Sequence, residues 1–336
     1  MLLICYGTRP EWIKIKPIIK KIDGVIPFRL LFTGQHVDLL DKVEYDHVRL
    51  EIKDGSNRLD SIVSSIMNNE EMFEGIDSVL VQGDTTSVFA IALAAFHRKI
   101  HVIHLEAGLR TYDKFNPYPE EFNRRSVSCI ADIHLCPTTE AVMNLKKEMS
   151  SGQIFLVGNT VLDNLVGTET SYTNKIVITL HRRENHATMD KWFEAIDELA
   201  KEYNEYEFIL PIHPNPNVIK HRHILKNVKV IEPLEHKDFV ELLASCRFLI
   251  TDSGGLQEES AFLRKKCIVC RKTSERVEGM GIFSVLCDAP KLLRGCFEWI
   301  DADHIPEESE ECPYGDGYSA DKIFKILTIK KGEQNV

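Results

Sequence analysis

Residues Ser78–Glu106 read SVLVQGDTTSVFAIALAAFHRKIHVIHLE, and the order of residue types in this stretch indicates the fold class. An apolar run over Ser78–Gln82 ends at a small polar turn, a helix-like stretch follows over Thr86–Arg98, and a second apolar run lies over His101–Leu105. A strand, a crossover helix and a second strand of these lengths form a βαβ unit, in which the two strands are parallel. The stretch therefore predicts an α/β protein with a parallel sheet.

The same alternation extends along the chain in both directions from this unit. Further runs typical of strands are Leu2–Tyr6, Arg29–Phe32, Ile133–Cys136, Ile154–Val157, Ile176–Leu180, Phe208–Ile212, Val228–Ile231, Phe248–Thr251 and Cys267–Val269. Further stretches typical of helices are Trp12–Ile22, Leu59–Met72, Thr139–Met149 and Ser319–Thr328. Alternating strands and helices predict a doubly wound sheet with helices on both faces.

The alternation stops at Gly167–Asn174, a polar and turn-rich run that we interpret as an interdomain linker. The 336 residues of the chain suit two domains of about 150 residues each. We predict two Rossmann-like domains with a cleft between them, over residues 1–167 and 175–317. A last helix, within residues 318–336, has the N-terminal domain as its candidate packing partner. Ligands of such sheets bind beyond the carboxyl ends of the strands, so the residues after each strand are the site candidates.

Charge and cysteine content restrict the classes of function. The chain has 41 Lys and Arg against 51 Asp and Glu, a net charge of −10, and we expect no nucleic-acid partner because that partner requires a basic surface. No apolar run reaches the length of about 20 residues that spans a membrane, so we expect no membrane insertion. Six of the nine cysteines lie in or beside apolar segments, which favours reduced thiols and a cytoplasmic location. Cys267 and Cys270 would point to opposite faces of a strand, so we expect them to pack in a core rather than to hold a metal.

In the N-terminal half, the candidate residues follow three of the predicted strands. Arg9 and Lys14 follow the first strand and suit a diphosphate, although a plain strand–helix turn with two surface cations fits equally well. Asp84 and Glu106 follow the next two strands of the Ser78–Glu106 unit, and Glu120 follows two prolines at the start of a helix. Carboxylates crowded together can divide acid and base roles. The alternative is a helix cap and unrelated surface acids.

In the C-terminal half, the strongest candidate is the turn after Phe248–Thr251. Ser253, Gly254 and Gly255 form a small-residue turn before a helix, where backbone N–H groups can hold a phosphate. Glu259 lies one turn further on and suits the hydroxyl groups of a ribose. His181 follows another strand as a candidate acid, base or phosphate donor. His213 lies between prolines, which also fits a role in a turn, and Arg276 offers a further phosphate contact.

Taken together, these segments resemble the non-hydrolysing UDP-N-acetylglucosamine 2-epimerase family. The matching segments are Gly7–Glu11, Gly34–His36, Gln82–Thr86, His104–Thr111, Pro119–Arg124, Gly158–Thr160, Leu180–Asn185, Asp252–Glu259 and Pro313–Gly317. The resemblance implies a GT-B-like pair of domains and an epimerisation that interconverts UDP-GlcNAc and UDP-ManNAc without a cofactor or a metal. In this reaction UDP is eliminated, 2-acetamidoglucal forms, and UDP adds back with C2 inverted.

The resemblance also implies roles for individual residues. The candidate catalytic residues are Asp84, Glu106, Glu120 and His181. The candidate contacts of the UDP-sugar are Arg9, Lys14, Arg124, His213, Ser253, Gly254, Gly255, Glu259 and Arg276. Bacterial members can use a second UDP-GlcNAc as an activator, for which the candidate residues are Gln35, His36 and Arg183. A homodimer is the expected assembly.

One segment departs from the pattern of the family. Residues Ser274–Glu278 read SERVE, where the family commonly reads TERPE. Because this segment belongs to the nucleotide or sugar pocket by resemblance, three other activities stay open. They are a hydrolysing 2-epimerase that releases ManNAc and UDP, a 2-epimerase of a modified UDP-sugar, and a GT-B glycosyltransferase. A non-catalytic sugar-nucleotide sensor is disfavoured by the three carboxylates.

Overall fold

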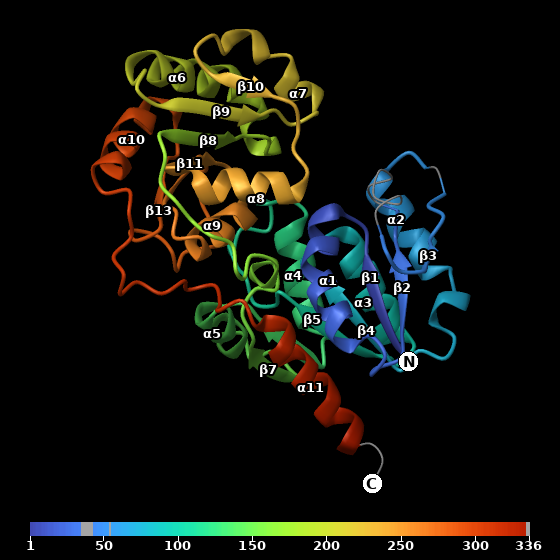
Figure 1. Ribbon diagram of the computed structural model, residues 1–336. Coiled ribbons are helices and arrows are strands. Elements are labelled where there is room, and N and C mark those ends of the chain that lie inside the picture. The colour runs from blue at the N-terminus through green and yellow to red at the C-terminus, as the bar shows by residue number, and fades with distance from the viewer. Residues whose placement is uncertain (35–42, 54, 334–336) are drawn as a thin grey trace. The chain divides into compact units, whose positions relative to one another are not determined.

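The chain forms two compact α/β units, each built on a parallel sheet with helices packed on it (Figure 1). The structure is a computed structural model that describes residues 1–34, 43–53 and 55–333. Unit 1 comprises Met1–Asn164 together with Gly315–Val336, and unit 2 comprises Leu165–Tyr314. The predicted fold class, α/β with two doubly wound parallel sheets, is confirmed.

Unit 1 has a seven-stranded sheet in the order β3-β2-β1-β4-β5-β6-β7. The strands are β1 (Leu2–Tyr6), β2 (Phe28–Phe32), β3 (His47–Arg49), β4 (Ser78–Gln82), β5 (His101–Leu105), β6 (Ile133–Cys136) and β7 (Gln153–Leu156). The helices are α1 (Arg9–Ile22), α2 (Arg58–Met67), α3 (Thr86–His97), α4 (Glu120–Ser128), α5 (Thr139–Lys147) and α11 (Ser319–Glu333). The order of the strands reverses between β1 and β4, so the turns after these strands lie at the topological switch point, where α/β sheets bind ligands.

Strand β1 shows why this sheet is covered on both sides. Ile4 and Tyr6 pack into one hydrophobic cluster together with α1 and α11, whereas Leu3 and Cys5 pack into another together with α2 and α3. Successive side chains of a strand point to opposite faces, so a continuous apolar strand requires two covering layers.

Unit 2 has a six-stranded sheet in the order β10-β9-β8-β11-β12-β13. The strands are β8 (Lys175–Thr179), β9 (Glu207–Pro211), β10 (Lys229–Ile231), β11 (Phe248–Thr251), β12 (Cys267–Val269) and β13 (Ser284–Leu286). The helices are α6 (Met189–Glu202), α7 (Pro216–Ile219), α8 (His236–Ser245), α9 (Gly254–Phe262) and α10 (Leu293–Ala302). The switch point lies between β8 and β11, and the turns after these two strands carry His181 and Ser253.

Some local features of the structure differ from what the sequence indicated. Strands β3 and β13, which were not predicted, have three residues each and pair at the edges of their sheets. The predicted helix Leu59–Met72 ends at Met67, because Asn68 caps α2 and the Asn69 side chain accepts from Met72 N at 3.1 Å, within a new turn.

The last helix and the linker run belong to different units. In α11, Ala320 and Ile323 are buried in the core of unit 1, and Ser319 N and Ala320 N donate to Asp163 at 3.2 and 2.8 Å. The run Gly167–Asn174 has no regular structure and lies on unit 2, where Ser171 N donates to the carbonyl of Ala244 at 3.1 Å.

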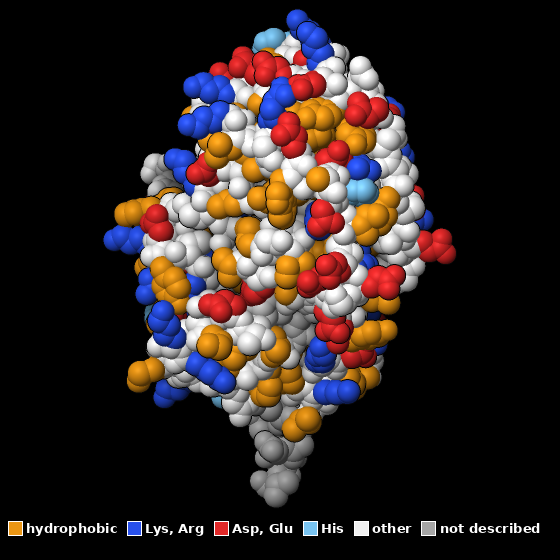
Figure 2. Space-filling view, turned by 90° about the vertical axis from the view of Figure 1, so that its left-hand side faces the viewer, with side chains coloured by type: hydrophobic (Ala, Val, Ile, Leu, Met, Phe, Trp, Pro, Cys, Tyr) orange, Lys and Arg blue, Asp and Glu red, His pale blue; other side chains and the backbone are white. Residues whose placement is uncertain are grey.

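The state of the cysteines and the mixture of surface charges agree with what the composition of the chain indicated. The nine cysteines, all within the described residues, form no disulfide, and the six that lie in or beside apolar segments, including Cys267 and Cys270, are buried, as predicted. On the face shown in Figure 2, acidic and basic side chains are interspersed. Within the described residues, no helix is both long enough and apolar enough to cross a membrane.

Candidate active site

Glu106 follows β5 and is held by side chains from two other elements. Lys14 Nζ of α1 lies 2.5 Å from Glu106 Oε2, and Gln82 Nε2, at the end of β4, donates to the same oxygen. The side chain of Glu106 is only 7% exposed, and its backbone has φ of +64°, a left-handed conformation that is rare for glutamate. Such a conformation is stable only where surrounding contacts determine it, and it occurs most often at functional sites.

Asp84 follows β4 and is tied to α4. Arg124 NH2 pairs with Asp84 Oδ2, and Asn123 Nδ2 donates to the carbonyl of Asp84 at 2.9 Å. Arg124 is buried, whereas the side chain of Asp84 is 27% exposed and open to a ligand. Glu120 begins α4 and lies one helical turn before Arg124, so these two side chains share a face of the helix. Arg124, predicted as a substrate contact, thus pairs with a predicted catalytic acid in this structure.

A buried histidine supports the turn between β4 and Asp84. His104 Nε2 lies 2.8 Å from the carbonyl of Gly83, so this nitrogen carries the proton and donates it. Burial lowers the pKa of His104 to about 3, which keeps the ring neutral. An N–H donor inside the sheet therefore fixes the carbonyl that precedes Asp84.

The turn after β1 uses its own backbone donors within helix α1. Thr8 Oγ1 accepts from Glu11 N, while Glu11 Oε2 accepts from Gly7 N at 2.6 Å and from Thr8 N at 3.2 Å. This capping box occupies N–H groups at the start of the helix. Arg9, which is half-buried, is the cationic side chain of this turn.

In unit 2, a fully buried carboxylate organises the turn that carries His181. Asp252 accepts from His181 N at 3.0 Å, from Arg182 N at 2.9 Å and from Asn185 Nδ2 at 3.0 Å. The rings of His181 and His213 stack, with centroids 4.9 Å apart. Burial lowers the pKa of His181, against the opposing effect of Asp252. The structure thus brings two predicted site histidines together.

Helix α9 begins with Ser253 as its N-cap, and the Ser253 side chain makes no capping hydrogen bond within the described residues. A Cβ atom on Gly254 would lie 2.9 Å from Arg276 NH1 and 3.0 Å from Glu275 Oε1. Arg276 Nε donates to Glu258 Oε1 at 3.0 Å, and its NH1 pairs with Glu275. Arg276, predicted to contact phosphate, therefore lies beside Gly254 in a buried ion-pair network.

The remaining predicted residues have separate places. Glu259 is buried in α9, with its Oε2 3.9 Å from His236 Nε2 of α8. Arg183 is exposed at the start of a 3₁₀ turn. Gln35 and His36 lie outside the described residues.

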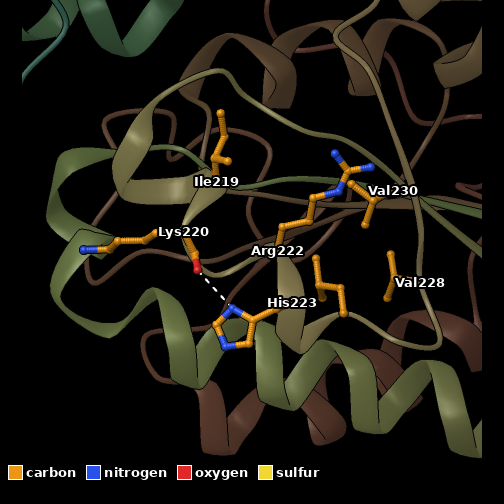
Figure 3. Close-up of a pocket in the computed structure, with 7 residues that line it drawn as sticks. Ile219, Lys220, Arg222, His223, Val228 and Val230 are labelled. Carbon is orange, nitrogen blue, oxygen red and sulfur yellow. Dashed lines mark hydrogen bonds between the residues drawn. The ribbon is translucent and has the colours of Figure 1, made fainter.

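A surface cavity of about 610 Å³ in unit 2 does not involve the predicted site (Figure 3). Figure 3 shows the ring of His223 turned toward the carbonyl of Lys220, at 3.0 Å. The residues that line this cavity are Ile219, Lys220, Arg222, His223, Leu225, Val228 and Val230.

Sequence reasoning missed several residues that hold the site together, namely Glu11, Gln82, Asn185, Asp252 and Glu258. Each lies within a segment already singled out at the end of a strand. The available signal was a polar side chain at a position where the sheet predicts burial, such as Gln82 at the last position of an apolar strand. Polar side chains in such places are usually hydrogen-bonded.

Two doubly wound parallel sheets, with charged side chains beyond the carboxyl ends of their strands, define an α/β protein of the GT-B-like class. The model of the UDP-N-acetylglucosamine 2-epimerase family matches residues 21–328. The chain belongs to this family and is an epimerase, as the sequence resemblance indicated.

Individual relatives match along almost their whole length. The UDP-N-acetylglucosamine 2-epimerase of Campylobacter jejuni is 35% identical over 385 residues, covering 100% of this chain and 99% of the relative. The structure of UDP-GlcNAc 2-epimerase from Neisseria meningitidis bound to UDP-GlcNAc is 34% identical, with a TM-score of 0.85, over 97% of this chain and 99% of that one. A structure of MnaA from S. aureus with UDP is 30% identical, with a TM-score of 0.88, over 98% and 96% of the two chains.

Proposed function

We propose that this chain interconverts UDP-GlcNAc and UDP-ManNAc by the non-hydrolysing route. The observation that carries the proposal is the arrangement of acids after β4 and β5. Asp84 is paired with Arg124, and Glu106 is held by Lys14 and Gln82. The family of the chain and the UDP-GlcNAc bound to the Neisseria relative support the choice of substrate.

The reaction needs proton transfer at a carbon that is not acidic. In the proposed elimination, the bond from C1 to the UDP oxygen breaks, a carboxylate takes the C2 proton, and the C2–H electrons form the C1=C2 bond. UDP then adds back to C1 while an acid delivers a proton to the other face of C2. Asp84, Glu106 and Glu120 supply three carboxyl groups for these steps, and a positioned acid–base group of this kind contributes about 10²–10⁴-fold to a rate.

The UDP group must stay bound while the glycal intermediate exists. In unit 2, we assign this role to the start of α9, where Ser253 leaves the first N–H groups of the helix without a side-chain cap within the described residues. The stacked pair of His181 and His213 adds donors for phosphate oxygens. In unit 1, Arg9 is the proposed contact for negative charge.

The Ser274–Glu278 segment departs from the family pattern, but its first residue still carries a hydroxyl group, and this group makes hydrogen bonds within the structure. Ser274 Oγ donates to Gln257 Oε1 at 3.0 Å and accepts from Arg276 N at 3.1 Å. A serine in place of the common threonine therefore keeps the link between this loop and α9, which supports an unmodified nucleotide site.

An NMR assay with UDP-GlcNAc in deuterated water tests the proposal. We expect UDP-ManNAc to form with deuterium at C2, because the removed proton exchanges with solvent before a new one is delivered. Release of free ManNAc and UDP as the products would replace the proposal with a hydrolysing 2-epimerase. An epimerised product without deuterium would rule out the elimination route.

We also propose that the protein is a homodimer and that it is cytoplasmic. Sedimentation velocity tests the dimer.

We further propose that a second UDP-GlcNAc activates the enzyme, with Arg183 among the contacts of the activator. A sigmoidal dependence of rate on UDP-GlcNAc that becomes hyperbolic in Arg183→Ala would support the activator site.

A further inference from the structure

Glu11 is a buried acid at the candidate site that the proposed reaction does not use. It lies in the first turn of α1, is 3% exposed, and accepts from Gly7 N and Thr8 N through one oxygen. These two donors belong to the turn after β1, immediately before Arg9. The position of that turn therefore depends on the carboxyl group of Glu11.

The same carboxyl group faces the turn after β4. Burial raises the pKa of Glu11 from its ordinary value of 4.5 to about 7, and the charge of Asp84 adds to the increase. Hydrogen bonds from Gly7 N and Thr8 N oppose it, and so does the nearby Thr85 side chain. Glu11 thus lies between the two turns that flank the switch point of the sheet of unit 1.

Two of the cations near Glu11 pair with other carboxylates, and Arg9 lies in the turn that Glu11 holds. Arg124, which faces this region from α4, pairs with Asp84, and Lys14 of α1 pairs with Glu106. Cys5 of β1 also faces Glu11, and burial raises the pKa of its thiol well above the usual range, so it stays neutral. Ionisation of Glu11 would place a second negative charge beside Asp84 and close to the turn of Arg9.

We propose that Glu11 is a positioning residue that joins the turns after β1 and β4, and that it must be a neutral carboxylic acid when the anionic substrate binds. The inference rests on the proposed function, since it takes UDP-GlcNAc as that substrate. Repulsion between an ionised Glu11 and the diphosphate disfavours binding, so substrate binding favours the protonated form.

The test compares the wild-type enzyme with Glu11→Gln from pH 5.5 to 8.5, with UDP-GlcNAc as the ligand. Glutamine has the shape of protonated glutamate and cannot ionise. Below pH 6 we expect the two enzymes to have similar KM values. Between pH 6 and 8.5 the KM of the wild type should rise by about threefold or more, as expected for one added charge near a bound anion, whereas the KM of Glu11→Gln stays nearly level. Parallel profiles would overturn the proposal.

Thr8→Ala provides the matched control, because it removes the other half of the capping box and leaves the carboxyl group of Glu11 in place. It should retain the wild-type rise in KM. If Thr8→Ala also loses the rise, the cap rather than the charge of Glu11 is responsible, and the proposal fails.

A second readout does not depend on activity. Between pH 4.5 and 7 a folded protein with this raised pKa binds a proton that the unfolded chain has lost, so wild-type stability falls as the pH rises through this range. The urea midpoint of the wild type should therefore fall relative to that of Glu11→Gln between pH 5 and 8. Parallel midpoints would overturn the proposal even for an enzyme that turns over UDP-GlcNAc. If the midpoints diverge but UDP-GlcNAc is not converted, the proposed function fails, and so does the link to this substrate.

Discussion

Glu106 accepts two hydrogen bonds on one oxygen, from Lys14 and from Gln82, and Asp84 has a comparable partner in Arg124. Donors that are already in place can stabilise a carboxylate with little rearrangement around it. At the residue scale, both acids are therefore held in position by side chains from other elements of unit 1.

Asp84→Asn, Glu106→Gln and Glu120→Gln each keep the shape of the side chain and remove its proton transfer. We expect kcat to fall by about 10²–10⁴-fold in each variant, while the Kd for UDP changes little. Steady-state kinetics and calorimetric titration of UDP measure the two quantities. Glu140→Gln, at an exposed position in the first turn of α5, is the control and should change neither. A Kd that weakens in proportion to kcat would mean that the acids hold the ligand or the fold.

At the scale of elements, helix α9 depends on the absence of a side chain at Gly254. A methyl group there would meet Arg276 NH1 at 2.9 Å, and that guanidinium is held by Glu258 and Glu275. At Gly255 the nearest atom to an added methyl group would be Glu259 Oε1, at 4.0 Å. Two adjacent glycines at the start of one helix thus have different packing constraints.

Gly254→Ala should displace Arg276 from its two buried partners. We expect the free energy of unfolding to fall by about 1–3 kcal/mol, the usual cost of overpacking, and the affinity for UDP to fall with it. Gly255→Ala has room for its methyl group and should change stability by no more than about 1 kcal/mol, the difference in helix propensity between the two residues. Urea unfolding and UDP titration measure both. Equal losses in the two variants would contradict the packing argument.

Helix α11 depends on a cap supplied from far along the chain. Asp163 accepts from Ser319 N and Ala320 N, and burial raises its pKa to about 6, so it is ionised at pH 7.5. Asp163→Ala should cost about 1 kcal/mol at that pH, as for other helix caps, and should increase hydrogen exchange in α11.

Asp321→Ala is the matched control, because Asp321 forms an exposed ion pair with Lys21. Exposed pairs contribute between about 0 and 1 kcal/mol, so this variant should leave the exchange of α11 almost unchanged. An effect as large as that of Asp163→Ala would show that the cap is not the main constraint.

At the scale of the whole molecule, unit 1 is made from two separate parts of the chain. The C-terminal segment returns to unit 1 after unit 2 is complete, and Ala320, Ile323 and Leu327 join the cluster that contains Trp12. Trp192 lies in the core of unit 2, and Trp299 is 50% exposed. Each unit therefore has its own buried fluorescent reporter.

Deletion of residues 315–336 should destabilise unit 1 and spare unit 2. Each fully buried aliphatic side chain that is lost contributes about 1.5–3 kcal/mol, so the unfolding transition reported by Trp12 should move to much lower urea or disappear. The transition reported by Trp192 should stay in place. Fluorescence of variants that retain a single tryptophan, with the others replaced by Phe, measures each transition. Equal shifts at both tryptophans would show that the two units unfold as one.

The sequence by itself determined the strands whose apolar runs are continuous. Six of them, β1, β4, β5, β6, β11 and β12, have the predicted ends, because a strand buried on both faces must be apolar along its length. Strand ends in a doubly wound sheet also indicate where a site forms, so Asp84, Glu106, His181 and Ser253 could be singled out without coordinates. The resemblance in the motifs at these ends was sufficient to indicate the family.

The tertiary structure decided the partners that charged side chains take from distant parts of the chain. Arg124 and Arg276, which the resemblance offers as ligand contacts, pair in this structure with Asp84 and with Glu258 and Glu275. No local pattern could reveal the pair of Arg124 with Asp84, because the two residues are 40 positions apart in the sequence. The edge strands β3 and β13 depended on the fold for a similar reason, since each has only three residues and is defined by its pairing with a neighbouring strand. Short-range periodicity fixes which side chains are buried, whereas ion pairs and sheet edges depend on contacts that only the folded chain makes.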